Sequence, residues 1–214
     1  MDFLVEHPVY KWLVVSPSVS PEHGPITAGC TMDNQIAFDA LHNTLLASYI
    51  AGEAPSFQDS LKQTLEKLPP MQIGKHNQLQ EWLEDVDNPK DEHRHISHLY
   101  GVYPGSSITA EKTPELMRAA RITLERRLAN GGGHTGWSRA WIIGLWAAFG
   151  NGKYSYENLK AILSMGTFSN LMDNHPYGDG YVFQIDGNLG AAAAMLEMLV
   201  KCRDNHVVLL PAIT

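Results

Sequence analysis

Apolar side chains recur every three or four positions along several stretches of the chain, which is the spacing of a helix that buries one face. From Thr31 to about Gly52 these positions are Ile36, Phe38, Leu41, Leu45, Leu46 and Tyr49. A second stretch starts at Ser56, which is a typical N-cap residue, and stops at two consecutive prolines, which cannot continue a helix. The pattern therefore predicts helices over residues 31–52 and 56–68.

The second half of the chain carries four more helical patterns. They cover residues 111–130, with Pro114 in the first turn, then 137–149, which is almost wholly apolar, then 156–165 and 188–202. Only residues 12–15 and 207–210 have a β-like pattern, and we expect solitary strands or extended loops there. Six helices with hardly any strand pattern predict an all-α fold, organised as a single domain over residues 1–214.

About forty residues, 71 to 110, show little periodicity. A connection of that length is uncommon in a compact domain unless it serves a function. Many of the chain's ten histidines and five tryptophans also lie in loop-like segments rather than in the periodic ones. We therefore look for chemistry in the loops.

Composition and charge narrow the classes of function. The 214 residues are 44% hydrophobic and 18% charged, as in an ordinary globular protein, and the formal net charge is −7. An acidic chain lacks the basic surface of a protein that binds nucleic acid or an anionic membrane, and a neutral or cationic small ligand fits better. No apolar run is long enough to span a bilayer, and residues 1–6 lack the basic start of a signal peptide, so we expect a soluble chain. The sequence does not indicate the cellular compartment.

The cysteine spacing and the common catalytic and nucleotide-binding motifs can also be checked along the sequence. Cys30 and Cys202 lie far apart without the spacing of metal ligands, which favours two free, buried thiols over a disulfide. The chain has no nucleophile elbow, no Walker A loop and no dinucleotide-binding glycine motif that opens a βαβ unit. Nucleotide chemistry is therefore not expected.

The segment 181–190 is the most informative candidate for chemistry. Asp186 comes just before a strongly apolar helix and is followed by Gly187, which lets the backbone turn or another group approach closely. An acidic residue at such a place is often the N-cap of the helix. Asn188 could equally be the cap, which would leave Asp186 available for catalysis.

Residues 93–98 bring together three histidines and Arg94. A zinc site is conceivable, but no cysteine is near and the guanidinium would repel a cation. A hydrogen-bonding platform for hydroxyl or carboxylate oxygens is the better interpretation, and a network that only braces the loop is the alternative.

Two aromatic segments and one proline-rich loop complete the candidates. Trp82 follows Glu81, and Trp137 begins an apolar helix, so both could stack on the apolar faces of a sugar, although either could instead belong to the core. Glu22 lies in a rigid loop and directly follows a proline. The loop either holds its carboxylate in a defined position for catalysis, or the residue is simply a solvated surface charge.

Taken in order, these loops resemble those of glycoside hydrolase family 95, the inverting α-L-fucosidases. The matching segments are Ser16-Pro17-Ser18-Val19-Ser20-Pro21-Glu22, Thr31-Met32-Asp33, Gln80-Glu81-Trp82, residues 93–99, Gly136-Trp137-Ser138, His175-Pro176, Phe183-Gln184-Ile185-Asp186-Gly187-Asn188 and Leu209-Leu210-Pro211-Ala212. The resemblance implies part of an (α/α)₆ barrel, or toroid. This chain would correspond to helices six to twelve, which makes about seven helices.

The resemblance also implies roles for individual residues. Glu22 matches the general acid and Asp186 the general base, while Glu81 is taken as substrate-binding and as second choice for the acid. Arg94, His95 and His175 match contacts to sugar hydroxyls, with Trp82 and Trp137 as aromatic walls. The implied partner is an oligosaccharide, terminating in α-1,2-linked fucose or in α-L-galactose, and neither a metal nor a cofactor is expected.

Two features depart from the family pattern. Residues 177–182 lengthen the loop between His175-Pro176 and the segment with Asp186, and within them Asp179 has the sequence context of a turn. The pair of asparagines that, in the family, polarises the catalytic water lies upstream and has no counterpart in the chain. An inactive fragment, or a non-catalytic carbohydrate-binding or structural module, is therefore the alternative, with the missing half or a second copy covering exposed helix faces. Family members are commonly exported.

Overall fold

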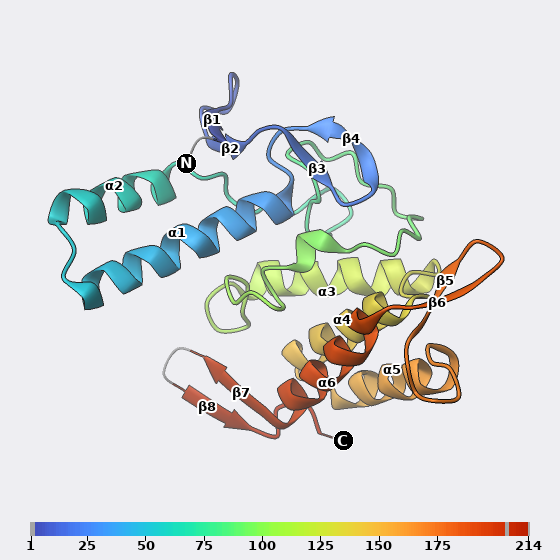
Figure 1. The fold of residues 1–214 in the computed structure, drawn as a ribbon. Coiled ribbons are helices and arrows are strands. Elements are labelled where there is room, and N and C mark those ends of the chain that lie inside the picture. The colour runs from blue at the N-terminus through green and yellow to red at the C-terminus, as the bar shows by residue number, and fades with distance from the viewer. Residues whose placement is uncertain (1–2, 204–205, 214) are drawn as a thin grey trace. The chain divides into compact units, whose positions relative to one another are not determined.

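The computed structural model describes residues 3–203 and 206–213 (Figure 1). Residues 1–2, 204–205 and 214 lie outside the described part. The chain forms two compact units. Unit 1 contains the residues up to Pro89 together with Ser97–Gly101, and unit 2 contains Lys90–Ile96 and the residues from Val102 onward.

Unit 1 is built from two helices and two β-hairpins. Its elements are β1 (Leu4–Glu6), β2 (Leu13–Val15), β3 (Ser18–Ser20), β4 (His23–Thr27), α1 (Thr31–Ala51), α2 (Pro55–Glu66) and the short 3₁₀ helix η1 (Ser97–Leu99). Both predicted helices are confirmed to within two residues at either end. Helix α2 begins at Pro55 rather than after a Ser56 cap, because the fixed φ of proline suits the first helical position. Leu41, Leu45 and Leu61 form the core between the two helices.

Unit 2 holds the other four predicted helices. Its elements are α3 (Pro114–Ala129), α4 (Gly136–Ala148), α5 (Gly152–Met165), β5 (Asn174–Tyr177), β6 (Gly180–Phe183), α6 (Ile185–Leu199), β7 (Val200–Arg203) and β8 (His206–Leu209). Helix α5 begins four residues earlier than predicted because the Asn151 side chain caps it by accepting from the Tyr154 N–H. Helix α6 begins three residues earlier and ends three residues earlier than predicted.

The core of unit 2 lies where α4, α5 and α6 pack side by side (Figure 1). Small side chains make this packing close, since a Cβ atom added at Gly190 of α6 would lie only 3.1 Å from the Cβ of Ala140 of α4. The core residues are Ala140, Ile143, Ala147, Ile162, Ala191, Ala194, Met198 and Ala212.

The expectation of an all-α fold is wrong in its strict form. The described residues are mostly helical, but they include four two-stranded antiparallel sheets, β1–β2, β3–β4, β5–β6 and β7–β8. The two predicted β-like stretches are strands, yet neither is solitary, because each pairs with a neighbouring segment. Those partners are only three or four residues long, and segments that short carry too little alternation to be recognised.

Both cysteines are free, as predicted, but only Cys30 is buried, while Cys202 on β7 is exposed. Burial raises the pKa of the Cys30 thiol, which keeps it in the uncharged form at neutral pH. Among the described residues no helix combines the length and the hydropathy needed to cross a bilayer.

Candidate active site

Glu22 lies at the tip of the β3–β4 hairpin in unit 1. The register pairs Ser20 with His23, so Pro21 and Glu22 form a two-residue turn. Glu22 has φ +53°, a left-handed conformation that residues other than glycine and asparagine adopt at an energetic cost. The side chain is exposed. The turn therefore holds a carboxylate at the surface in one backbone conformation.

Glu81 occupies the opposite environment, since only 1% of its surface is exposed. Its carboxylate accepts a hydrogen bond from Ser20 Oγ, and Ser20 Oγ lies 3.0 Å from Ser97 Oγ. The other carboxylate oxygen of Glu81 is 3.6 Å from Nδ1 of His98, which is fully buried. This network fastens the residue that precedes the Pro21–Glu22 turn to the interior of unit 1.

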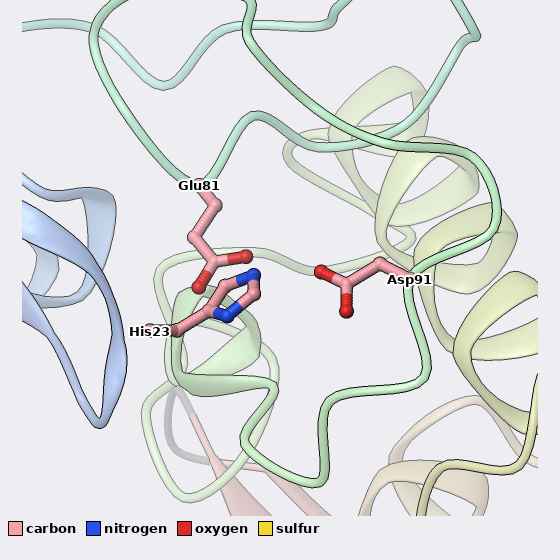
Figure 2. A group of neighbouring side chains, drawn as sticks. All are labelled: His23, Glu81 and Asp91. Carbon is pink, nitrogen blue, oxygen red and sulfur yellow. The ribbon is translucent and has the colours of Figure 1, made fainter.

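Trp82 stands beside the same hairpin. Its ring centroid is 5.4 Å from that of His23, and its indole atoms would lie 3.3 Å from a Cβ atom added at Gly24. Figure 2 shows the His23 imidazole next to the Glu81 carboxylate. The indole thus packs on strand β4 and is half-buried, leaving part of it exposed. Asp91, also drawn in Figure 2, belongs to unit 2.

The start of helix α1 holds the loops of unit 1 in place. Asp33 accepts from Ser18 Oγ at 2.6 Å, which ties strand β3 to the first turn of the helix. Thr31 donates from its N–H to the Glu81 carbonyl and from its hydroxyl to the Gln80 carbonyl. Gln35 donates to the His98 carbonyl at 2.9 Å. Polar residues at the helix start thereby position the segments that carry Glu22 and Glu81.

In unit 2, Arg127 of α3 organises the loop of residues 90–96. Its guanidinium donates to the carbonyls of His93 and His95 and pairs with Asp91 at 2.8 Å. The Arg127 side chain is 4% exposed and the Asp91 side chain 11%, so the pair is protected from water. The loop that presents Arg94 and His95, both half-buried, is therefore held by a buried ion pair.

His95 and Trp137 come together in the same unit, with ring centroids 4.6 Å apart. Trp137 belongs to the first turn of α4, whose start is fixed by Ser138, since its Oγ accepts from the Thr135 N–H. His93 stacks on His95, with the two ring centroids 5.1 Å apart. The three rings make a continuous aromatic surface from two segments, residues 93–95 and Trp137, which are 42 residues apart in the sequence.

Asp186 is exposed in the first turn of α6. The N-cap residue of this helix is Gln184, so neither of the two caps considered from the sequence is correct. The Asn188 side chain instead accepts from the Asp173 N–H at 2.9 Å and donates to the Leu171 carbonyl at 2.8 Å. Asp186 thus has no capping role.

His175 lies on β5, directly before the insertion that the sequence analysis singled out. Residues 177–182 form the end of the β5–β6 hairpin, with Tyr177 paired to Gly180 and a two-residue turn between them. Asp179 lies in that turn, as predicted. The added residues extend a β-ribbon while His175 stays half-buried in its first strand.

Asp173 is a charged residue at the site that the sequence analysis missed. It is only 1% exposed, and it lies next to Gly136 at the start of α4 and Gly187 at the start of α6. Burial raises the pKa of its carboxyl, and the nearby negative charge of Asp186 adds to the rise, while His175 opposes it. No local pattern marks Asp173 in the sequence, because the two glycines that it contacts lie 37 and 14 residues away along the chain.

The predicted site residues therefore form two groups. Unit 1 carries Glu22, Glu81 and Trp82 on or beside one hairpin. Unit 2 carries Arg94, His95, Trp137, His175 and Asp186 in the loop 90–96 and around the starts of α4 and α6. In each unit an exposed carboxylate accompanies aromatic and hydrogen-bonding side chains, which is the combination that sugar recognition uses.

Comparison with known proteins identifies the family. The model of the glycosyl hydrolase family 95 catalytic domain matches residues 1–199 of the chain. The chain belongs to glycoside hydrolase family 95. Among curated proteins, this family 95 chain is 35% identical to Alpha-L-fucosidase 2 of Arabidopsis thaliana, over 94% of the chain and 26% of that protein.

Two fungal relatives give the same picture. Probable alpha-fucosidase A of Aspergillus niger is 33% identical over 90% of the family 95 chain, and that of Aspergillus oryzae is 32% identical over 88%. The matched regions make up 25% and 28% of these two proteins. The family 95 chain thus spans about a quarter of the length of the curated relatives that it matches.

Proposed function

We propose that this family 95 chain supplies catalytic residues of an inverting glycoside hydrolase that removes terminal α-L-fucose, or α-L-galactose, from oligosaccharides. The proposal is carried by the family match over residues 1–199 together with two exposed carboxylates on well-defined backbone, Glu22 and Asp186. The names of the three relatives support fucose as the sugar.

The chemistry divides between the two carboxyl groups. An inverting glycosidase needs an acid that protonates the leaving oxygen and a base that takes a proton from water on the opposite face of the sugar. Glu22 is the proposed acid: its proton goes to the glycosidic oxygen as the C1–O bond breaks. Asp186 is the proposed base: it accepts a proton as the water oxygen bonds to C1. The products are β-fucose and the shortened oligosaccharide.

The remaining residues bind the sugar in this proposal. The ring surface of His95 and Trp137 offers an apolar wall for the C–H face of the sugar, and Arg94 and His175 supply donors for its hydroxyls. Trp82 serves as the wall in unit 1. Glu81 holds the hairpin that carries Glu22 in place through its contacts with Ser20 and His98, and it remains the second choice for the acid. The β5–β6 hairpin leads directly into the helix that carries Asp186. In this proposal its added residues reshape the binding site for the sugar next to the base and change which sugar is preferred.

The proposal extends to the architecture. We propose that residues 1–214 belong to one domain and correspond to helices six to twelve of an (α/α)₆ barrel. The helical hairpin of α1 and α2 and the packed helices α4 to α6 are the kinds of elements that such a barrel repeats. The apolar side chains that remain exposed, such as Leu189 and Leu196 of α6, would then pack on further helices or on a second copy.

A non-catalytic role is the second candidate. The His95–Trp137 ring pair and the half-buried Trp82 offer surfaces that need no catalytic step to hold a sugar. A module with the aromatic and hydrogen-bonding surface but an incomplete catalytic apparatus would bind fucose without cleaving its glycoside. The two candidates differ in one measurable property: the hydrolase both binds and cleaves the fucoside, whereas the non-catalytic module only binds it.

The test is hydrolysis of a fucosyl-α-1,2-galactose disaccharide by the 214-residue chain, followed by proton NMR to identify the first anomer released. The proposed function predicts β-fucose, with turnover reduced at least a thousandfold in Glu22→Gln and Asp186→Asn. Glu115→Gln is the matched control, because this carboxylate is exposed on α3 and pairs with Arg118 rather than with a candidate residue, and it should keep wild-type turnover.

Two outcomes contradict the proposal. Release of α-fucose would mean retention, which requires a different mechanism. Fucose binding measured by calorimetry without any hydrolysis, on a sample that elutes as a folded species, would favour the non-catalytic module.

A further inference from the structure

The buried carboxylate of Asp173 is the feature of unit 2 that the proposed mechanism leaves unexplained. Among the residues that the structure describes, neither of its oxygens accepts a hydrogen bond of ordinary geometry, and the backbone N–H of His175 is the donor that faces it. Burying such a group costs free energy, which proteins accept mainly at sites with a function. The position of Asp173 between two helix starts indicates what that function is.

The carboxylate is held by shape. A Cβ atom added at Gly136 would lie 2.5 Å from Asp173 Cγ, and one added at Gly187 would lie 2.7 Å from it. Both distances are far shorter than van der Waals contact, so any side chain at either glycine would displace Asp173. The absence of side chains at Gly136 and Gly187 therefore leaves the space that the carboxylate fills.

The two glycines belong to the first turns of α4 and α6. The Asp173 side chain packs directly against both of these turns, through close contact rather than through hydrogen bonds from their N–H groups. One carboxylate against two such turns joins the two helix starts. Asn188 adds a second tie by accepting from the Asp173 N–H at 2.9 Å.

We propose that Asp173 is the positioning residue for the candidate base, because it joins the first turns of α4 and α6 and so fixes Asp186 and Trp137 relative to one another. The inference rests on the proposed function, in which Asp186 is the base and Trp137 is a sugar wall. Asp173 does not touch the reacting atoms in this scheme. It acts by keeping the neighbouring Gly187 and Gly136 turns in one arrangement.

The kinetic test uses Asp173→Ala and Asp173→Asn in the 214-residue chain. Alanine leaves a gap between the two turns, so kcat should fall at least tenfold while KM changes less than threefold. Asparagine has nearly the same shape and keeps an acceptor oxygen, and it should restore kcat to within about threefold of wild type. Glu157→Ala, an exposed acid on α5, is the control and should leave both constants unchanged.

A double-mutant cycle tests the contact without any assay of activity. Gly187→Ala should shift the unfolding equilibrium strongly in the wild-type background, since its Cβ collides with Asp173. In the Asp173→Ala background the same change should shift that equilibrium at least tenfold less. If Asp173→Ala does not fold, Asp173→Ser, which is small and keeps an acceptor, takes its place in both experiments.

Each result decides the proposal. Wild-type kcat in Asp173→Ala, or a change confined to KM, would overturn it. If the wild-type protein folds but cleaves no fucoside, the proposed function fails, and the stability cycle alone then decides: additive effects at 173 and 187 overturn the joining role, and the tenfold coupling supports it.

Discussion

Single residues at the candidate site are held in conformations and environments that cost free energy. Glu22 has φ +53° at the second position of a two-residue turn, where glycine or asparagine is favoured. Such a cost is typical of functional positions, because the surrounding structure fixes what the residue would not adopt on its own. The sequence showed that the loop is rigid, but only the hairpin register shows that the carboxylate is at its tip.

Glu22→Asn should therefore stabilise the fold while abolishing turnover. Asparagine adopts the left-handed conformation more easily than glutamate, so the free energy of unfolding should rise by about 1 kcal/mol. Urea denaturation measures the stability, and the disaccharide assay measures the turnover. An unchanged or lower midpoint with unchanged slope would contradict the conformational argument.

Asp173 gives a prediction about pH. Because its pKa is raised in the folded state from the ordinary value of 3.8, the folded protein holds this proton more tightly than the unfolded chain does. The resulting stabilisation is fully present below pH 3.8 and is lost as pH rises through the raised pKa. The charged groups that face this carboxyl are Asp186, which favours the proton, and His175, which opposes it.

The measurement compares wild type with Asp173→Asn across pH 4 to 8. The free energy of unfolding of wild type should decline with rising pH relative to that of the variant, which has no proton to lose at this position. Parallel curves for the two proteins would show that burial does not perturb this carboxyl.

At the scale of elements, the helices pack through small side chains. Ala194 of α6 is fully buried in the core with α4, whereas Ala193 beside it is exposed. The alanine run made this helix easy to predict from sequence. Which of the four alanines face the core followed only from the packing against α4.

Ala194→Val should destabilise unit 2 by about 1–3 kcal/mol, because two extra methyl groups do not fit in a closely packed core. Ala193→Val is the matched control: it changes helix propensity equally but stays at the surface, so its cost should be within about 0.7 kcal/mol. Thermal or urea denaturation of both variants checks the difference. Equal effects would mean that the α4–α6 contact is loosely packed.

The ends of elements were less predictable than their existence. Helix α6 was expected to start at Asn188, but it begins at Ile185 and includes Gly187, where only glycine leaves room for the Asp173 side chain. The short strands were missed for another reason. Pairs of three or four residues are stabilised by the hairpin that they close and by their neighbours, and the local pattern of polar and apolar residues hardly shows them.

At the scale of the whole chain, large apolar side chains remain exposed. In unit 2 they include Leu189, Leu196, Val207, Leu209 and Leu210, each more than 60% exposed. Apolar surface of this kind on a protein usually marks a place where another surface packs. This agrees with a chain that spans about a quarter of the length of its relatives.

The 214-residue chain by itself should therefore self-associate at micromolar concentrations. Size-exclusion chromatography with light scattering should show a mass above 23.7 kDa that rises with concentration. Leu196→Lys with Leu209→Lys should shift the chain toward the monomer, whereas Val86→Lys, an equally exposed site in a loop of unit 1, should not. A monomer at all concentrations would contradict this prediction.

The sequence by itself determined the helices, the family resemblance and the residue types of the candidate site. Helical periodicity is a local property, and the motifs with Glu22, Glu81 and Asp186 are contiguous, so both can be read along the chain. The tertiary structure decided the rest: the burial of Glu81, the meeting of His95 with Trp137, and the place of Asp173 between two glycines. These depend on contacts between segments far apart in sequence, and no local pattern encodes which side chains will meet.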